Sequence, residues 1–387
     1  MLITRLKLKN WRNFPDVDVP LGHRVYVIGA NASGKSNLLD VFRFLRTVAQ
    51  SDGGGLQKAI KERGGMKKLR SLHARKDTEV RFEVELRESI YDETAHWRYV
   101  LAFKPEGTGK QRVLITEESA WCDGKKVMED RPNSADRKDT ARLTQTHLEQ
   151  INNNAEFREL AEHFAATTYL HLVPQLLKHA DEISGRLMEN DPFGQGLLQR
   201  IAATSKKVGD ARLRRIQTSL DKSVPLFSEL RFVKNDEVTG APHLEARFKH
   251  WREHGAWQRE DQFSDGTLRL IGLLWALQDG DGTLLLEEPE LSLNEAIVER
   301  IPLMLDRVLR DRKKGVRQVL VSTHSEKLVA SLGDASSVLL LEPGDNGTRI
   351  RPPDADEMKA MEHGLNPAEV LLPKTRPLHV EQMGLFV

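Results

Sequence analysis

One eight-residue stretch near the N-terminus constrains the fold of this chain more than any other feature: Gly29-Ala30-Asn31-Ala32-Ser33-Gly34-Lys35-Ser36. A short apolar run, 25–28, precedes it, and residues 37–50 carry apolar side chains at helical spacing. Strand, glycine-bearing loop and helix in this order form a P-loop, in which backbone N–H groups and the positive end of the helix bind phosphate. The alternative, a turn with a stray lysine, does not account for the flanking strand and helix.

The side chains of the loop predict a nucleotide site that holds a metal. Lys35 can reach the β- and γ-phosphates of a nucleotide, and the Ser36 hydroxyl can ligate Mg²⁺. The residues that we expect to contact the nucleotide here are Gly29, Asn31, Ala32, Ser33, Gly34, Lys35, Ser36 and Asn37.

Composition narrows the class of protein. The 387 residues carry a net charge of only +1, so no global basic field indicates a nucleic-acid binder. A single cysteine, Cys122, excludes an internal disulfide framework and fits a reducing cytosol, and nothing near it in sequence argues for thiol activation. The longest apolar run, 270–277, is too short to cross a bilayer, and the N-terminus has no signal-peptide pattern. We expect a cytoplasmic protein without membrane contact.

The segments after the P-loop helix predict antiparallel strands. Apolar and polar residues alternate over 80–86, 97–103 and 113–115, and also over 2–8 at the N-terminus. A β-subdomain in this place is unlike a simple doubly wound nucleotide domain.

The middle of the chain is polar and then helical. Residues 131–154 indicate a loop or a helical link, and 155–226 are mainly helical in pattern with interruptions at prolines. Residues 230–248 suggest a hairpin. The helical part contains a basic cluster, for which a solvated helix face and nucleic-acid contact are the two interpretations: Lys206, Lys207, Arg212, Arg214 and Arg215.

The last third returns to alternating strands and helices. Apolar runs at 284–286, 319–321 and 338–341 predict buried parallel strands, and 294–310 predicts a helix that Pro302 can kink. We expect these strands to share one sheet with 25–28, and 284–287 to lie directly beside it, so that the domain is discontinuous in sequence.

A second motif ends the first of these strands. Leu284-Leu285-Leu286 is followed by Glu287 and Glu288, the pattern of a Walker B strand. By position, Glu287 is the acid on the metal side and Glu288 the acid that orients or deprotonates the attacking water. The usual first acid is Asp, so the longer Glu287 must contact the metal with a different spacing.

Two further stretches carry candidate site residues. Ser264-Asp265-Gly266 begins a helix at 268–277, where backbone N–H groups can receive an anion, although an ordinary N-cap explains the same residues. His324 follows the strand at 319–321, where an imidazole can reach and report a γ-phosphate.

These four pieces in this order, with the N-terminal stretch Asn10-Trp11-Arg12-Asn13-Phe14, resemble the ABC-type ATPase heads of SMC, RecF and OLD proteins, particularly stand-alone RecF/OLD-like ATPases. The resemblance implies that Ser264-Asp265-Gly266 is the signature loop, 290–294 the D-loop and His324 the switch histidine. It also implies ATP as ligand, and a homodimer or higher homo-oligomer in which the signature loop of one subunit closes on ATP held by the P-loop of another.

The chain departs from the family pattern at several positions. Ala32 stands where the family usually has Gly, Glu287 replaces Asp, and no glutamine of a Q-loop can be assigned, with 64–73 as the region to search. No heptad pattern for a coiled-coil arm is present. The residues after Leu341 are too few for a Toprim nuclease of the OLD type, so we expect any effector to be a separate polypeptide.

The expected fold is therefore an α/β P-loop NTPase of the ABC-ATPase-head type, with a mixed or parallel sheet, an antiparallel β-subdomain and a helical insert. The expected segments are ATPase lobe I, helical insert, ATPase lobe II and C-terminal tail, at 1–130, 131–228, 229–350 and 351–387. The tail predicts a helix at 357–364, an extended stretch at 371–377 and an apolar end at 383–387, which is either packed on its own core or docks a partner.

Three functions follow from this pattern. The leading hypothesis is an ATPase that dimerises on ATP and regulates a separately encoded effector, a nuclease or other toxin, in anti-phage defence, with Lys35, Glu288 and His324 as catalytic residues. The second is a RecF-like DNA-repair ATPase that binds DNA directly through the basic cluster on 206–215 or the basic run 61–76. The third is a slow-turnover nucleotide sensor or scaffold. Ala32 and Glu287, which differ from the usual family residues, support this third hypothesis.

Overall fold

The computed structural model describes residues 1–74, 77–107, 112–179, 191–237, 240–249, 257–310 and 317–375. The chain forms two compact units, and each is discontinuous in sequence. The first contains Met1–Thr168, Asp281–Leu285 and Gly315–Val387, and the second contains Tyr169–Gly280 and Leu286–Lys314. The predicted apolar end at 383–387 lies outside the described residues. Among the described helices, none is both long enough and apolar enough to cross a membrane.

This division differs from the four segments expected from the sequence. The first unit continues to Thr168, beyond the expected boundary at 130. The reason is Arg131, which is 2% exposed and donates to the carboxylates of Glu118 and Asp136, at 3.0 Å and 2.9 Å. This buried ion-pair cluster ties the polar segment that follows residue 130 to the β-subdomain.

The strands of the first unit form most of two sheets. They are β1 (Leu2–Trp11), β2 (Phe14–Pro20), β3 (Arg24–Gly29), β4 (Val80–Arg87), β5 (Trp97–Pro105), β6 (Val113–Cys122), β7 (Lys125–Lys126), β13 (Val319–Thr323), β14 (Val338–Gly344) and β15 (Gly347–Arg351). The helices are α1 (Lys35–Ala49), α2 (Leu56–Glu62), α3 (Met66–Leu69), α4 (Ser134–Lys138), α5 (Arg158–Ala165), α12 (Glu326–Ala330), α13 (Ala355–Glu362) and α14 (Pro367–Leu371). Short 3₁₀ helices add Leu72–Ala74, Thr140–Thr144, Ala155–Phe157, Ala335–Ser337 and Leu372–Thr375.

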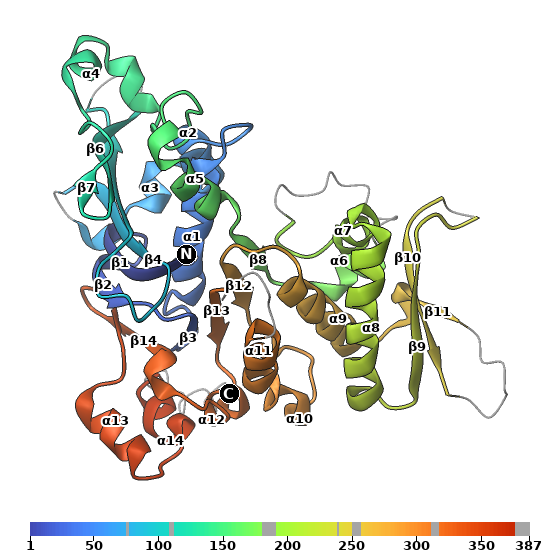
Figure 1. Cartoon of the computed structure of the whole chain (residues 1–387). Helices are drawn as coiled ribbons and strands as arrows, with labels where there is room; N and C mark the ends of the chain where they lie inside the picture. The colour runs from blue at the N-terminus through green and yellow to red at the C-terminus, as the bar shows by residue number, and fades with distance from the viewer. Residues whose placement is uncertain are drawn as a thin grey trace, which may run out of the picture. The chain divides into compact units, whose positions relative to one another are not determined.

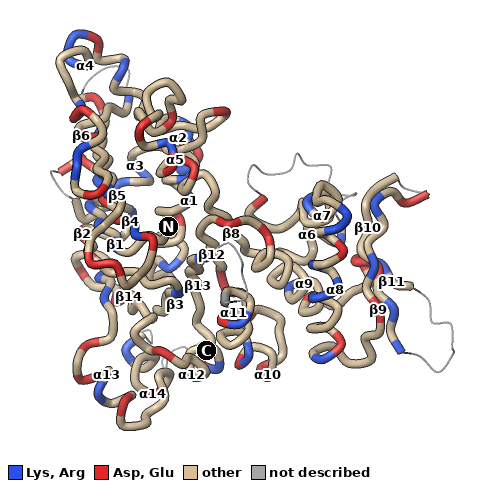
Figure 2. Tube along the Cα trace, viewed as in Figure 1, with Lys and Arg blue, Asp and Glu red and all other residues tan. Residues whose placement is uncertain are grey.

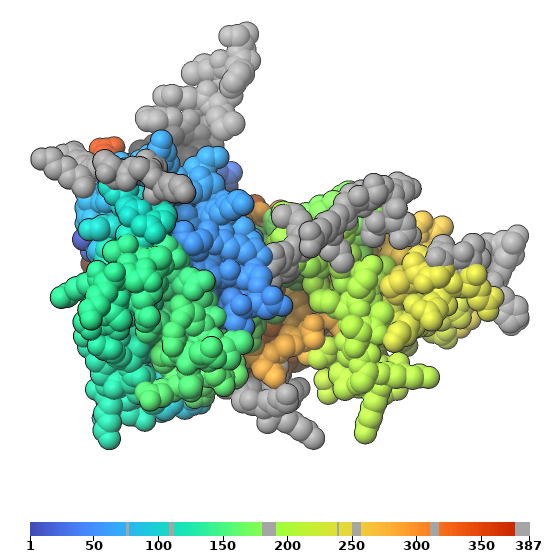
Figure 3. Space-filling view, turned by 90° about the horizontal axis from the view of Figure 1, so that it is seen from above, coloured from blue at the N-terminus to red at the C-terminus, as the bar shows by residue number. Residues whose placement is uncertain are grey.

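The second unit is mainly helical and has a small sheet. Its elements are α6 (Pro174–Lys178), α7 (Leu197–Ala203), α8 (Lys206–Ser223), β9 (Phe227–Val233), β10 (His243–Phe248), β11 (Gln258–Arg259), the 3₁₀ helix Glu260–Gln262, α9 (Asp265–Gln278), α10 (Glu295–Val298) and α11 (Ile301–Arg310). Strands β8 (Thr168–Leu170) and β12 (Leu284–Glu287) are divided between the two units. The expected hairpin is confirmed, because β10 pairs antiparallel with β9. Helix α8 contacts β9, and Figure 3 shows the yellow-green part of the chain next to the yellow part that follows it.

The antiparallel β-subdomain predicted from alternation is confirmed. Its strand order is β2-β1-β4-β5-β6-β7, and Leu6 of β1 faces Val19 of β2 and Val84 of β4. Apolar side chains on one face of this sheet meet α1, where the rings of Trp11, Phe44 and Phe82 lie 5.1–5.3 Å apart. This aromatic cluster fixes the P-loop helix to the β-subdomain.

The second large sheet carries the strands that end at the predicted motifs. Its order is β15-β14-β3-β13-β12-β8, and β3 is parallel to both β13 and β14. N-terminal and C-terminal segments therefore lie side by side, seen as blue beside red in Figure 1. The expected parallel arrangement is confirmed for these strands.

Three local expectations were wrong. Strand β13 lies between β3 and β12, so 284–287 is not directly beside 25–28. The helix expected over 294–310 is two helices, α10 and α11, and Pro302 is the second residue of α11, where its missing N–H is tolerated and no kink is needed. Residues 371–375 are helical rather than extended, because Asn366 and Glu369 form a capping box that starts α14.

Candidate nucleotide site

The P-loop is built at the junction of β3 and α1 in the first unit. Gly34 is the N-cap residue of α1 and has φ +102°, a conformation that favours glycine. A Cβ at this position would also lie 2.1 Å from Nδ2 of Asn13, so no side chain fits. Ala32 has φ +62°, so the alanine that replaces the usual glycine adopts a strained conformation that glycine adopts at little cost.

The Lys35 side chain is hydrogen-bonded to the first residues of the P-loop. Its ammonium donates to the carbonyl oxygens of Gly29 at 2.8 Å and Ala30 at 3.1 Å, and the residue is only 8% exposed. A buried cation held at the start of the loop is poised to pair with phosphate oxygens. Ser36 is exposed on the first turn of α1, where its hydroxyl is accessible to a metal ion.

Asn13, in the turn between β1 and β2, holds the loop in place. Its Nδ2 donates to the carbonyl of Ser33 and to Oγ1 of Thr348, both at 2.8 Å, and its Oδ1 accepts from Nδ2 of Asn37 at 2.7 Å. One amide therefore connects the β1–β2 turn, the P-loop, α1 and β15. Asn13 was absent from the predicted site residues, although the stretch around it contributed to the family resemblance.

A buried carboxylate braces the next turn of α1. Asp40 is 6% exposed and accepts from Arg12 at 2.6 Å and from Arg63 at 2.8 Å. Burial alone would raise the pKa of this carboxyl, but Arg63 and then Arg12 outweigh burial and hold the pKa below its usual value. Arg63, part of the basic run considered for DNA contact, is thus engaged inside the first unit.

The P-loop and His324 share one pocket. A cavity of about 500 Å³ is lined by Gly29, Ala30 and Asn31 of the loop and by His324, which is exposed after β13. The structure therefore brings together two of the sequence-predicted pieces within the first unit. Ser264, Asp265, Gly266, Glu287 and Glu288 belong to the second unit.

The predicted signature loop starts α9. The Ser264 hydroxyl caps the helix by accepting from the backbone N–H of Thr267 at 3.2 Å, and Ser264 is exposed. A Cβ on Gly266 would lie 2.6 Å from the carbonyl oxygen of Ser292, in the segment expected to be the D-loop, which explains why glycine is needed there. The ordinary N-cap and the anion site remain compatible, because they use neighbouring donors.

Asp265 is anchored to α6. Its carboxylate accepts from Lys178 and from Gln175, both at 2.7 Å, and Lys178 is the main cause that lowers its pKa. The side chain thus fixes the signature loop within the second unit.

Glu287, the expected first Walker B acid, has unexpected partners on β8 and directly after it. Tyr169 Oη donates to Glu287 Oε2 at 2.5 Å, and His171 Nδ1 lies 3.2 Å from the backbone oxygen of Glu287. The longer glutamate side chain is what reaches the tyrosine. His171 is the first residue after β8, so both contacts with Glu287 come from the end of this strand. Both were missed from the sequence, since the three-residue β8 shows no clear alternation.

Glu288 and Arg269 complete this part of the second unit. Glu288 has φ +46°, so the chain turns sharply at the residue after β12. Arg269 of α9 lines a small cavity with Glu287, and its pKa is lowered by burial despite the opposing charges of Asp265 and Glu288. This arginine, also missed from the sequence, lies near both predicted motifs of the unit.

We expect Glu287 to hold Mg²⁺, and we predict that Tyr169→Phe weakens this binding. The hydroxyl orients the carboxylate, and loss of such an outer-shell hydrogen bond typically costs about tenfold in metal affinity. The measurement is the Mg²⁺ concentration that half-saturates binding of a fluorescent ATP analogue, which should rise about tenfold. Tyr91→Phe, at an 88% exposed position, is the matched control. An unchanged Mg²⁺ dependence in Tyr169→Phe would contradict this role.

The basic cluster on α8 is partly used in local packing. Arg212 pairs with Asp279 at 2.8 Å and its guanidinium lies 5.1 Å from the ring centroid of Trp275. Lys206, Lys207 and Arg214 remain exposed, and Figure 2 marks the lysines and arginines of this helix in blue.

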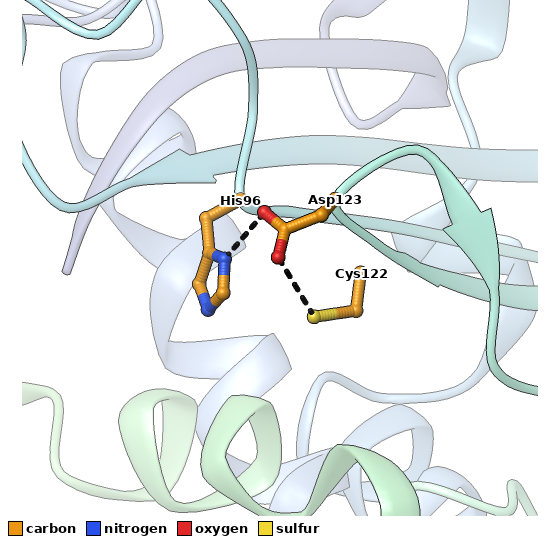
Figure 4. A group of neighbouring side chains, drawn as sticks. All are labelled: His96, Cys122 and Asp123. Carbon is orange, nitrogen blue, oxygen red and sulfur yellow. Dashed lines mark hydrogen bonds and ion pairs between the residues drawn. The ribbon is translucent and has the colours of Figure 1, made fainter.

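Cys122 lies in a separate group of potential metal ligands with His96 and Asp123 (Figure 4). His96 Nδ1 is 2.8 Å from Asp123 Oδ1, which ties the start of β5 to the β6–β7 turn. Burial and then Asp123 raise the pKa of the Cys122 thiol, which disfavours the thiolate needed for a metal ligand or a nucleophile. A structural hydrogen bond between His96 and Asp123 accounts for this group.

Comparison with protein families decides what kind of protein this is. The family model described as "AAA domain, putative AbiEii toxin, Type IV TA system" matches residues 25–330, from β3 to α12. The chain belongs to this family. The matched range of the AAA domain includes the P-loop, the expected signature loop, the two expected Walker B acids and His324.

Curated relatives match a short part of the chain. A stretch of 58 residues is 45% identical to the DNA replication and repair protein RecF of Brucella abortus (strain 2308) and to that of Brucella suis biovar 1 (strain 1330). The stretch is 15% of this chain and covers only 14% of the length of these RecF proteins.

Solved structures show the fold over nearly the whole chain. An SmcHead bound to the C-winged helix domain of ScpA has a TM-score of 0.54 and 16% identity, with 92% of this chain and 99% of that chain covered. An Smc head domain with an extended coiled coil from Pyrococcus furiosus has a TM-score of 0.50 and 15% identity, with 93% and 98% covered. The resemblance to SMC/RecF-like ABC-type ATPases and the α/β fold class are confirmed.

Proposed function

We propose that this member of the AAA-domain family binds ATP with Mg²⁺, dimerises head to tail on ATP, hydrolyses it, and thereby regulates a separately encoded effector in anti-phage defence. The observation that carries the proposal is the buried ammonium of Lys35, which donates to the carbonyl oxygens of Gly29 and Ala30, two P-loop residues that line one pocket with His324. A lysine held there pairs with the terminal phosphates of a nucleotide.

The residues fit ATP and Mg²⁺. The loop has the glycine at position 34 that close approach requires. The groups that would hold the metal are the Ser36 hydroxyl in the first unit and the Glu287 carboxylate in the second unit, each proposed from its own place in the sequence. The ion supplies charge neutralisation at the phosphates when bound. Glu288 orients the attacking water and accepts its proton, and His324 contacts the terminal phosphate.

Dimerisation is proposed from the signature loop. Ser264 is exposed at the start of α9, and Gly266 packs directly against the backbone at Ser292. Donors at an exposed helix N-terminus suit an anion presented by another molecule. The defence role rests on the family description, which names a toxin and a toxin–antitoxin system.

The experiment that tests the proposal measures the mass of the purified protein by light scattering without nucleotide, with ADP and with ATP. We expect a monomer without nucleotide, a dimer with ATP, and a return to monomer as phosphate is released. A mass that does not respond to ATP, together with normal ATP binding, would remove dimerisation from the proposal.

A further inference from the structure

The C-terminal segment of the described chain packs next to the P-loop. In the first unit, α14 contacts α12, and the 3₁₀ helix Leu372–Thr375 contacts β3 and β14. Ala368 is 4% exposed and Leu371 is fully buried. The tail up to residue 375 is therefore packed on the core of its own unit, whereas the two alternatives for the apolar end concern 383–387, which lie outside the described residues.

A buried carboxylate anchors this segment. Glu357 of α13 is 3% exposed and accepts from Arg351 of β15 at 2.7 Å and 2.9 Å, and also from Lys374. Arg351 is the main cause that lowers the pKa of Glu357 to about 2. The carboxylate thus stays charged at neutral pH and ties the 3₁₀ helix to β15.

The anchored segment forms part of the nucleotide pocket. Five of its residues line the same 500 Å³ cavity as the start of the P-loop and His324: Ala368, Glu369, Leu372, Pro373 and Thr375. The Lys35 ammonium donates to the carbonyl oxygens of Gly29 and Ala30, and both residues line this cavity, so the cavity borders the group that we expect to pair with the terminal phosphates.

Two carboxylates at this cavity would repel a negatively charged nucleotide. Glu326 and Glu369 both line the cavity, and both are exposed. ATP has a third phosphate that ADP lacks, so only ATP places charged oxygens at the far end of the P-loop, and carboxylates near that position cost more free energy for ATP than for ADP. Glu369 also accepts from the backbone N–H of Asn366 at 3.2 Å in the capping box of α14, a bond that a glutamine can keep.

We propose that the segment Pro367–Thr375 forms a fixed wall of the nucleotide pocket at the terminal phosphate, and we call this segment the wall. Glu369 on the wall sets the preference between ATP and ADP. This proposal rests on the proposed function. The wall lowers the affinity for ATP relative to ADP, so that the ATP-bound state forms only when a compensating cation is present.

The test compares Glu369→Gln with the wild type in binding of ATP and ADP by calorimetry. We expect the Kd for ATP to fall about threefold to tenfold at low salt, with ADP changed less than about twofold, and the difference to shrink at high salt. The matched control is Glu362→Gln at the exposed end of α13, which should leave both constants unchanged. Lys374→Ala, which loosens the anchor of the wall, should also change the ratio of the two constants.

The outcomes distinguish a failure of the wall proposal from a failure of the proposed ATP-binding function. Equal shifts for ATP and ADP, or no shift, in Glu369→Gln would overturn the wall proposal while Lys35→Ala still abolishes binding of both nucleotides. Unchanged nucleotide binding in Lys35→Ala would instead overturn the proposed function. Thermal unfolding of each variant checks that the altered affinity is not a consequence of lost structure.

Discussion

Replacing Glu288 by Gln is expected to leave ATP binding intact, to lower the hydrolysis rate by about 10²–10⁴-fold, and to trap an ATP-bound dimer. Glutamine has nearly the same size as glutamate, and the two residues pay the same conformational free energy at the φ of +46° that Glu288 adopts. The backbone after β12 should therefore be unchanged. Only the ability to accept a proton from water is lost. The trapped dimer then persists because the event that separates the subunits no longer occurs.

The measurement for Glu288→Gln combines phosphate release with the mass in solution after ATP is added. Glu295→Gln, on the exposed start of α10, is the control and should turn over ATP like the wild type. Wild-type hydrolysis by Glu288→Gln would show that Glu288 is not the water-side acid. A monomer that binds ATP but neither hydrolyses it nor associates would instead favour the slow-turnover sensor.

Replacing Lys35 by Ala is expected to reduce ATP affinity by at least about a hundredfold, because the ammonium that pairs with the terminal phosphates is removed. The apo fold should survive, since the bonds that Lys35 donates at 2.8 Å and 3.1 Å go to loop carbonyls. The measurement is ATP binding by calorimetry. Lys67→Ala, an exposed lysine on α3, is the control, and an unchanged Kd in Lys35→Ala would remove the P-loop assignment.

Much of the fold could be predicted because its strands and the P-loop leave strong local patterns. Alternation over 80–86 and 97–103 identified β4 and β5, and the continuous apolar runs identified β12, β13 and β14. The order of the parallel strands was less accessible. No local sequence pattern predicts that β13 lies between β3 and β12, because the strand order depends on the path of the crossover connections.

The parts of the site that the sequence missed act through side chains distant in sequence. Asn13 bonds to Ser33 and, across the chain, to Thr348. Tyr169 reaches Glu287 only because β8 is in the same sheet as β12. Each is a common polar residue whose local sequence indicates no role in the site, and only proximity in the folded chain gives it one.

The measurement that tests the central claim most directly mixes two inactive variants. Lys35→Ala lacks the P-loop cation, and Ser264→Arg blocks the exposed start of α9. In a head-to-tail dimer, a mixed pair still holds one complete site, made of the intact P-loop of one subunit and the intact signature loop of the other. An equal mixture should therefore recover about a quarter of the wild-type ATPase rate, because half of the dimers are mixed and each has one of two sites. No recovery of ATPase activity in the mixture, although each variant folds and the wild type is active, would contradict a site shared between two copies of this chain.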